Sequence, residues 1–99
     1  MERYVYYGML FDIYQKLLNE RNREVFELYY EENLTLQEIA DNLDVSKSYI
    51  GRIIKNTEKK LDDLEEKLHI YKNRQKLKEL LEYDDINKIK EKLQSIIEE

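Results

Sequence analysis

The sequence lacks the residues from which several kinds of functional site are built. It contains no cysteine, which excludes disulfides and thiolate metal sites, and its only histidine is His69. A zinc site based on imidazole would therefore need a second chain. No apolar run approaches the roughly 20 residues of a membrane-spanning helix, and the first residues, crowded with Tyr, Glu and Arg, do not resemble a signal peptide. We expect a cytoplasmic protein with no membrane span, no metal and no cofactor.

Residues that interrupt helices are scarce as well. Proline is absent, glycine occurs only as Gly8 and Gly51, and 39% of the residues are charged. Because Leu, Ile, Glu and Lys fill much of the chain, its composition predicts an all-α protein. Ninety-nine residues suit one cooperative domain. Each of the nine tyrosines carries a polar hydroxyl, so we expect many of them at the edge of the core.

The sequence shows no pattern typical of catalysis. There is no nucleophile paired with histidine and no glycine-rich phosphate loop. The carboxylates lie in charged helical runs, without a spacing that suggests a pair for acid–base chemistry. We therefore expect no catalytic residue and a protein that is not an enzyme.

The apolar pattern of the stretch TLQEIADNLDVSKSYIGRIIK, residues 35–55, predicts two short helices joined by a corner. The apolar residues are Leu36, Ile39, Ala40, Leu43, Val45, Ile50, Ile53 and Ile54. Helical spacing holds up to Leu43, is interrupted by Val45 and restarts at Ile50. Thr35 and Glu38 have the spacing of a capping box, and Ser46 is a candidate N-cap for the second helix. Asp44 lies at the bend, and Asp tolerates a left-handed conformation there. The segment is typical of a helix-turn-helix, although an ordinary corner between helices is the alternative.

Charge is distributed unevenly along this acidic chain, whose formal charge is −5. Residues 1–45 carry −6 and residues 61–99 carry −3, whereas residues 46–60 carry +4 from five Lys or Arg and one Glu. The basic window coincides with the helix that the motif would present, residues 46 to about 55. A localised phosphate-binding surface requires such a coincidence.

The presented helix supplies the predicted binding residues. Lys47, Arg52 and Lys55 are the expected phosphate ligands, flanked by Lys59 and Lys60. The full set of predicted nucleic-acid-binding residues is Ser46, Lys47, Ser48, Tyr49, Arg52, Lys55 and Lys59. The alternative for the basic window is a solvated helix face whose charges balance acidic neighbours.

Two residues of the presented helix have two interpretations each. Tyr49 either stacks on a base or lies at the edge of the core. Gly51 costs the helix about 1 kcal/mol relative to alanine, so either a partner approaches the backbone closely there or the glycine is unselected.

Other apolar repeats predict helices before and after the motif. A first helix covers residues 7–18, preceded by either a further turn or a loose segment. A second helix covers about residues 20–31 and begins at Asn19 as its N-cap. A last helix is capped by Asp84 or Asp85.

Heptad spacing extends the fourth helix beyond the motif. Apolar positions recur in alternating steps of four and three at Ile50, Ile54, Thr57, Leu61, Leu64, Leu68 and Tyr71. We predict one continuous helix from Ser46 to near Arg74, with a bend near residues 72–76. The seam either pairs two chains or forms a strut for the first helix, and we favour a homodimer. Residues 1–60 would form the helix-turn-helix domain, and residues 61–99 a helical extension for oligomerisation.

Longer stretches resemble known bacterial proteins. The run NREVFELYYEENLTLQEIADNLDVSKSYIGRIIKNTEKKL is similar to the region 4 helix-turn-helix of bacterial sigma factors. The run MLFDIYQKLLNERNREVFELYYEENLTLQEIADNLDVS resembles the YlxM family, whose pattern also has Asp where Asp44 stands, and the similarity covers about residues 7–68. The resemblance implies a small, cytoplasmic, non-enzymatic protein that is encoded beside the signal recognition particle GTPase. It also implies nucleic-acid binding, with the particle's RNA as the expected partner.

One departure from the family pattern bears on what the helix reads. Family members commonly carry Arg-Gln directly after the capping serine, where this chain has Lys47-Ser48. Lysine is a point charge without the planar fork of arginine. Phosphate or RNA-shape contacts therefore fit this chain better than readout of base edges.

Two functions of different class follow. The first is a regulatory nucleic-acid-binding protein of the signal recognition particle pathway, which contacts the particle's RNA or, alternatively, promoter DNA as a transcriptional regulator. The second is an adaptor that contacts the targeting GTPase or its receptor through apolar and acidic surfaces and binds no nucleic acid.

Overall fold

The structure is a computed structural model that describes residues 2–99. Within this range the chain is helical and has no strand, which confirms the all-α prediction. The elements, in chain order, are α1 (Arg3–Tyr14), the 3₁₀ turn η1 (Gln15–Leu17), α2 (Glu20–Tyr30), α3 (Leu36–Leu43), α4 (Lys47–Leu68), α5 (Ile70–Glu79), the 3₁₀ turn η2 (Leu80–Glu82) and α6 (Ile86–Ile97).

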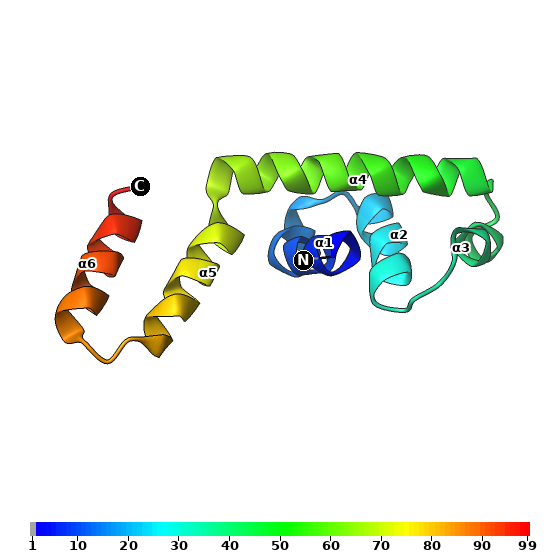
Figure 1. The fold of residues 1–99 in the computed structure, drawn as a ribbon. Coiled ribbons are helices and arrows are strands. Elements are labelled where there is room, and N and C mark those ends of the chain that lie inside the picture. The colour runs from blue at the N-terminus through cyan, green and yellow to red at the C-terminus, as the bar shows by residue number, and fades with distance from the viewer. Residues whose placement is uncertain (1) are drawn as a thin grey trace.

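The long helix α4 organises the other elements (Figure 1). α1, α2 and α3 pack along one side of it, whereas α5 and α6 project beyond its C-terminal end as a hairpin. α4 has 22 residues, which corresponds to about 33 Å of helix. The described chain is elongated, with extents of 57 × 22 × 18 Å, because the hairpin lies outside the cluster of the first four helices.

Local side-chain caps fix where several helices begin. The Asn19 side chain accepts a hydrogen bond from the backbone N–H three residues later at 2.8 Å and starts α2, as predicted. Asp85, one of the two predicted caps, accepts from the N–H two residues later at 2.9 Å and starts α6. α1 begins at Arg3, so residues 3–6 add a helical turn before the predicted start. Met1, which belonged to the same prediction, lies outside the described residues.

The hydrophobic core lies where α1, α2 and α3 meet the inner face of α4. Its fully buried side chains come from all four helices and include Leu10, Phe11, Val25, Phe26, Ile39, Ile50 and Leu61. The first part of the heptad seam is buried in this core at Ile50, Ile54, Thr57 and Leu61. Within one chain, this part of the seam therefore packs against the preceding helices, which was one of its two predicted roles. The homodimer stays a prediction, and a second chain would have to use other apolar surface.

The fourth helix is shorter than predicted. The prediction of one helix to near Arg74 is wrong, because α4 ends before His69, which adopts a left-handed conformation with φ 55°. Both oxygens of the Glu65 carboxylate then accept hydrogen bonds from the first turn of α5, at 3.0 and 2.9 Å. Because Glu65 caps a new helix, the chain breaks at this point and not near residues 72–76.

Three tyrosine hydroxyls donate hydrogen bonds to carboxylates spaced along α4. The pairs are Tyr30–Glu58 at 3.1 Å, Tyr7–Asp62 at 2.7 Å and Tyr14–Glu65 at 2.6 Å. Burial is the largest cause that raises the pKa of Tyr7 and Tyr14 to about 12, and the bonds to the carboxylates add to it. Tyr30 is half-buried at the edge of the core, as predicted for many of the tyrosines, whereas Tyr7 and Tyr14 are buried more deeply. The three tyrosines hold α1 and α2 to α4 through polar contacts that the apolar pattern does not reveal.

Candidate nucleic-acid interface

The corner between α3 and α4 has the local geometry that the sequence predicts. The Thr35 hydroxyl accepts from the Glu38 N–H at 3.1 Å, and the Glu38 carboxylate accepts from the Thr35 N–H at 2.9 Å, which completes the capping box. The bond from the Thr35 N–H is the largest cause that lowers the pKa of Glu38. Asp44 adopts the left-handed conformation, with φ 55° and ψ 49°, and Ala40 is fully buried. Aspartate tolerates the left-handed conformation, and the small side chain of Ala40 lets α3 lie close to α4.

α4 opens with a side-chain cap and has no acidic residue in its first turn. The Ser46 hydroxyl oxygen accepts from the Tyr49 N–H at 3.1 Å, as predicted for the N-cap. Lys47 and Ser48 are exposed in the same turn. The remaining N–H groups carry the positive end of the helix dipole, and no carboxylate within the turn competes for an incoming anion.

Exposed residues of α4 form a basic stripe, which consists of Lys47, Ser48, Arg52, Lys55 and Lys59. The last four follow each other in steps of four, three and four, a spacing that places side chains on one face of a helix. These four positions cover about 17 Å of helix length. The basic stripe thus contains every predicted phosphate ligand on the solvent side of α4.

The cations of the basic stripe have no acidic partner in the described part of the chain. The ion pairs formed within residues 2–99 use other cations and are Arg3–Glu58, Arg21–Glu24, Lys67–Asp63, Lys72–Glu99 and Lys76–Glu99. A helix face that balanced its acidic neighbours would show such contacts. The geometry instead leaves the cationic tips free to contact an external anion.

Two residues of the presented helix stand apart from the basic stripe. Tyr49 is half-buried and packs against the hydrophobic core, as expected for a residue at the edge of the core. Gly51 has room for a side chain, since a Cβ placed there meets no atom within 4 Å. Packing within this chain therefore does not explain the glycine.

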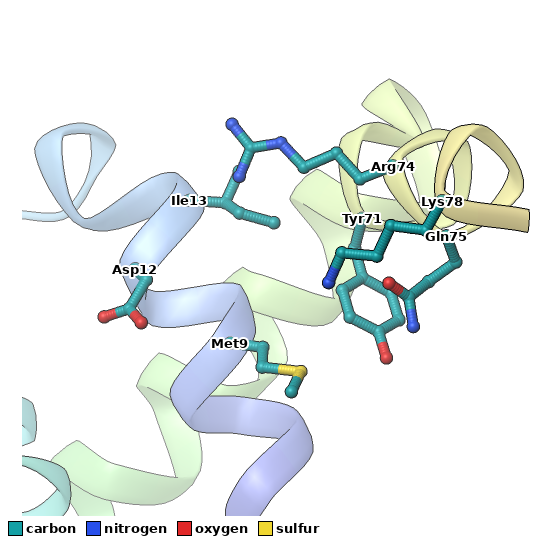
Figure 2. A pocket seen from close by; sticks show the side chains of 7 residues that line it. All are labelled: Met9, Asp12, Ile13, Tyr71, Arg74, Gln75 and Lys78. Atoms are coloured by element: carbon teal, nitrogen blue, oxygen red, sulfur yellow. The ribbon is translucent and has the colours of Figure 1, made fainter. Parts of the chain in front are cut away.

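A small cleft lies between α1 and α5, away from the corner between α3 and α4 (Figure 2). Arg74 and Lys78 extend across it from α5 towards α1, as Figure 2 shows. Its volume of about 160 Å³ is below the roughly 300–1,000 Å³ of small-molecule sites. Among residues 2–99, no cluster of His, Asp and Glu is arranged to hold a metal ion, and no helix is long and apolar enough to cross a membrane.

A second basic segment, in α5, was not predicted from the sequence. Residues 69–78 carry four cations and no acid, the cations being Lys72, Arg74, Lys76 and Lys78. Residues 79–85 carry four acids and no cation, namely Glu79, Glu82, Asp84 and Asp85. The charge averaged over residues 61–99 hid both segments, and a window of about ten residues reveals them.

The arrangement of α3 and α4 places this chain among the helix-turn-helix proteins. Comparison with known families narrows the class, because residues 1–99 match the family described as "Putative helix-turn-helix protein, YlxM / p13 like". The chain belongs to this family, UPF0122, as the resemblance to YlxM implied. The description of the family names a helix-turn-helix protein and no enzymatic activity.

Relatives from several bacteria match most of this chain. It is 38% identical over 92 residues to a UPF0122 protein of Mycoplasma capricolum, covering 93% of this chain and 81% of the relative. It is 42% identical over 73 residues to a UPF0122 protein of Halalkalibacterium halodurans, covering 74% and 67%. It is 35% identical over 105 residues to a UPF0122 protein of Bacillus cereus, covering 99% and 94%.

Proposed function

We propose that this protein binds nucleic acid through phosphate contacts of the basic stripe, as a cytoplasmic regulatory protein of the signal recognition particle pathway. One observation carries the proposal. An acidic chain exposes a run of cations, without acidic partners among residues 2–99, on the presented helix of its helix-turn-helix. Phosphate contacts by such cations supply all of non-specific binding to nucleic acid and a large share of specific binding.

The proposed contacts follow from the position of each side chain. Lys47 binds a phosphate next to the free N–H groups at the start of α4, and Ser46 and Ser48 hydrogen-bond the same part of the backbone. Arg52 and Lys55 bind phosphates further along the stripe, with Lys59 at its end. If about three to five phosphates are neutralised, the logarithm of the affinity falls with the logarithm of the salt concentration at a slope of about −3 to −4.

RNA of the signal recognition particle is the proposed partner, as the resemblance to YlxM implied. The tip Lys47-Ser48 fits contacts to the phosphate backbone, because lysine acts as a point charge and lacks the planar fork of arginine. Double-stranded RNA is recognised mainly through its backbone and shape. Promoter DNA is the alternative nucleic acid.

Titration of the full chain against the particle's RNA and against a random DNA duplex tests the proposal. The variant Lys47→Glu/Arg52→Glu/Lys55→Glu should lose at least about tenfold in affinity, since like charges then face the phosphates. The matched control Lys16→Glu/Lys67→Glu/Lys90→Glu changes the net charge equally at exposed sites off the basic stripe.

The outcomes separate the candidate functions. Tighter binding of the RNA than of the duplex, lost in the stripe variant and kept largely intact in the control, supports the proposal. Equal losses in both variants show only the effect of net charge and contradict it. If neither nucleic acid binds, and the stripe variant still captures the targeting GTPase or its receptor, the protein is an adaptor instead.

A further inference from the structure

The sequence around the break between α4 and α5 contains no local signal that ends a helix. Residues 61–79 include neither glycine nor proline, and the heptad positions Leu64, Leu68 and Tyr71 pass through the break without interruption. At the start of α2, α3, α4 and α6, a cap side chain accepts a backbone hydrogen bond. The N-cap of α5 is His69, and its side chain makes no such bond. The local sequence therefore favours a helix that continues from α4 into α5.

The backbone of His69 adopts a conformation that is unfavourable for its residue type. With φ 55° and ψ 27°, it lies in the left-handed region. Crowding by the Cβ atom makes this conformation roughly five- to thirtyfold less populated than the right-handed one. His69 is exposed, so packing of its own side chain does not compensate. Contacts made elsewhere must therefore hold the chain bent at this joint.

Two buried side chains, Tyr14 and Glu65, supply these contacts, and we call the pair the latch. The Glu65 carboxylate accepts a hydrogen bond from the Tyr14 hydroxyl at 2.6 Å and is 9% exposed. Its oxygens also accept from the N–H groups of Tyr71 and Lys72 at 3.0 and 2.9 Å. The Tyr14 hydroxyl oxygen accepts from the Ile70 N–H at 3.3 Å. The latch thus binds three N–H groups in the first turn of α5.

The same three N–H groups would have partners in a continuous helix. In an α-helix each N–H donates to the carbonyl four residues earlier, so these groups would donate to Glu66, Lys67 and Leu68. Those carbonyls belong to the last turn of α4, which has no intrahelical donor where the helix ends. A bent and a straight chain therefore differ by an exchange of three hydrogen bonds, and neither leaves a donor of this turn unpaired.

The helices α5 and α6 are built to move together. Figure 1 shows them side by side beyond the end of α4, connected to it by a short link. Lys72 and Lys76 of α5 form ion pairs with Glu99, which follows α6, and Leu80 is buried in η2 between the two helices. A change at His69 would therefore carry α5, η2 and α6 as one body.

The packing of α5 against α1 is incomplete. The cleft of about 160 Å³ lies between the two helices, with Ile13 and Tyr71 among its lining residues (Figure 2). Side chains that line an unfilled gap lose dispersion contacts. The Tyr71 ring does meet the Tyr6 ring edge-on, with 5.4 Å between their centroids. The position of α5 thus depends on the latch as well as on this partial packing.

We propose that the joint at His69 is a two-position switch. In the bent position, described above, the latch holds α5 against α1. In the straight position, residues 47–79 form one helix, and α5 with α6 swings away from α1. The switch decides whether α5 covers the part of α1 around Met9 and Ile13. A partner that binds one position more tightly shifts the population towards it. The switch does not depend on the proposed nucleic-acid binding.

Distances between two spin labels test the switch, and the absence of native cysteine allows the labels to be placed at will. The labelled variant is Asp12→Cys/Lys78→Cys, because both positions are exposed and both line the cleft. Double electron–electron resonance should show mainly a short distance, and the straight position adds a longer one.

Substitutions at His69 should shift the two populations in opposite directions. His69→Gly removes the cost of the left-handed conformation and weakens a continuous helix, so the short distance should become the only one. His69→Ala has the reverse effects, so the longer distance should grow. The ratio of the two populations should differ between these variants by at least about tenfold. The matched controls Asn56→Gly and Asn56→Ala change an exposed position of α4 that is helical in both positions, and they should have equal ratios.

Removing part of the latch tests its role separately. Tyr14→Phe lacks the hydroxyl that holds Glu65 and accepts from the first turn of α5, so the longer distance should grow. Adding His69→Gly to Tyr14→Phe should restore the short distance. A mere loss of stability in Tyr14→Phe would not be reversed in this way.

Three results would overturn the proposal. One identical distance in the wild type, His69→Ala and Tyr14→Phe would show a rigid bend. Equal populations in His69→Gly and His69→Ala would place the movement elsewhere. A population that responds to His69→Ala but not to Tyr14→Phe would show that the latch does not hold the bend. None of these results bears on RNA binding by the basic stripe, which the stripe variant tests separately.

Discussion

Replacing Gly51 by alanine should change stability and nucleic-acid binding in opposite directions. In the free protein the added methyl group meets no atom within 4 Å, so the substitution changes only the helix propensity. Alanine exceeds glycine by about 0.5–1 kcal/mol inside a helix, and the free energy of unfolding should rise by that amount. In the complex, the methyl group would occupy space next to the basic stripe, where we expect the nucleic-acid backbone to approach α4. Loss of one charged hydrogen bond would cost about 1.5–3 kcal/mol, which weakens binding about tenfold or more.

Urea unfolding followed by circular dichroism measures the first effect, and fluorescence anisotropy with labelled RNA measures the second. Gly8→Ala is the matched control, because Gly8 lies in α1, off the basic stripe. A Cβ placed at Gly8 makes an ordinary contact with Tyr30 at 3.8 Å. Gly8→Ala should change stability in the same direction and leave binding unaltered. If Gly51→Ala stabilises the protein without weakening binding, no partner approaches the backbone there and the glycine is unselected. If it destabilises the protein, our account of the space around Gly51 is wrong.

Three further perturbations test the account of the fold. Tyr14→Phe removes the donor to the buried Glu65 and should lower the free energy of unfolding by about 1–3 kcal/mol in urea, more than Tyr7→Phe, whose carboxylate partner is exposed. Because the pKa of Tyr7 and Tyr14 is raised to about 12, both stay neutral in the folded chain while the unfolded tyrosines ionise near pH 10. Stability should therefore be unaffected by these groups below about pH 10 and fall between about pH 10 and 12, less so in Tyr14→Phe, as thermal melts across that range will show. Thr35→Ala removes the hydroxyl half of the capping box and should cost about 1 kcal/mol in the same urea assay, with no loss if the box is unimportant.

The helix-turn-helix could be predicted from the sequence because its signals are local. The capping box joins Thr35 to a residue three positions away, and the Ser46 cap also reaches three positions. Asp44 adopts its left-handed conformation within a turn that the apolar spacing already marks. Contacts between residues three positions apart depend only on a short stretch of sequence, so the residues that form them can be recognised there.

The end of α4 could not be predicted in this way. The Glu65 carboxylate caps α5 from six and seven residues away and is itself held by Tyr14, 51 residues earlier in the chain. The heptad spacing passes through the break at His69 without interruption, so it predicted a longer helix. Only the tertiary packing of α1 against α4 brings these groups together.

In the candidate site, the exposure of the cations could be predicted from the sequence, whereas the orientation of Tyr49 could not. Exposure of Lys47, Arg52 and Lys55 follows from helical spacing once the buried face is known. Tyr49 lies next to the buried Ile50 and between the two faces, and spacing alone does not decide to which face it belongs. The core packing of α4 decides it, and Tyr49 packs inward.

The salt dependence of RNA binding tests the central claim most directly, because it counts phosphate contacts. For the wild type, a plot of log affinity against log salt should have a slope of about −3 to −4, and the variant Lys47→Glu/Arg52→Glu/Lys55→Glu should flatten it by about three contacts. A wild-type slope near zero, or an equal slope in the variant, would contradict the account, since α4 would then meet no phosphate through these three side chains.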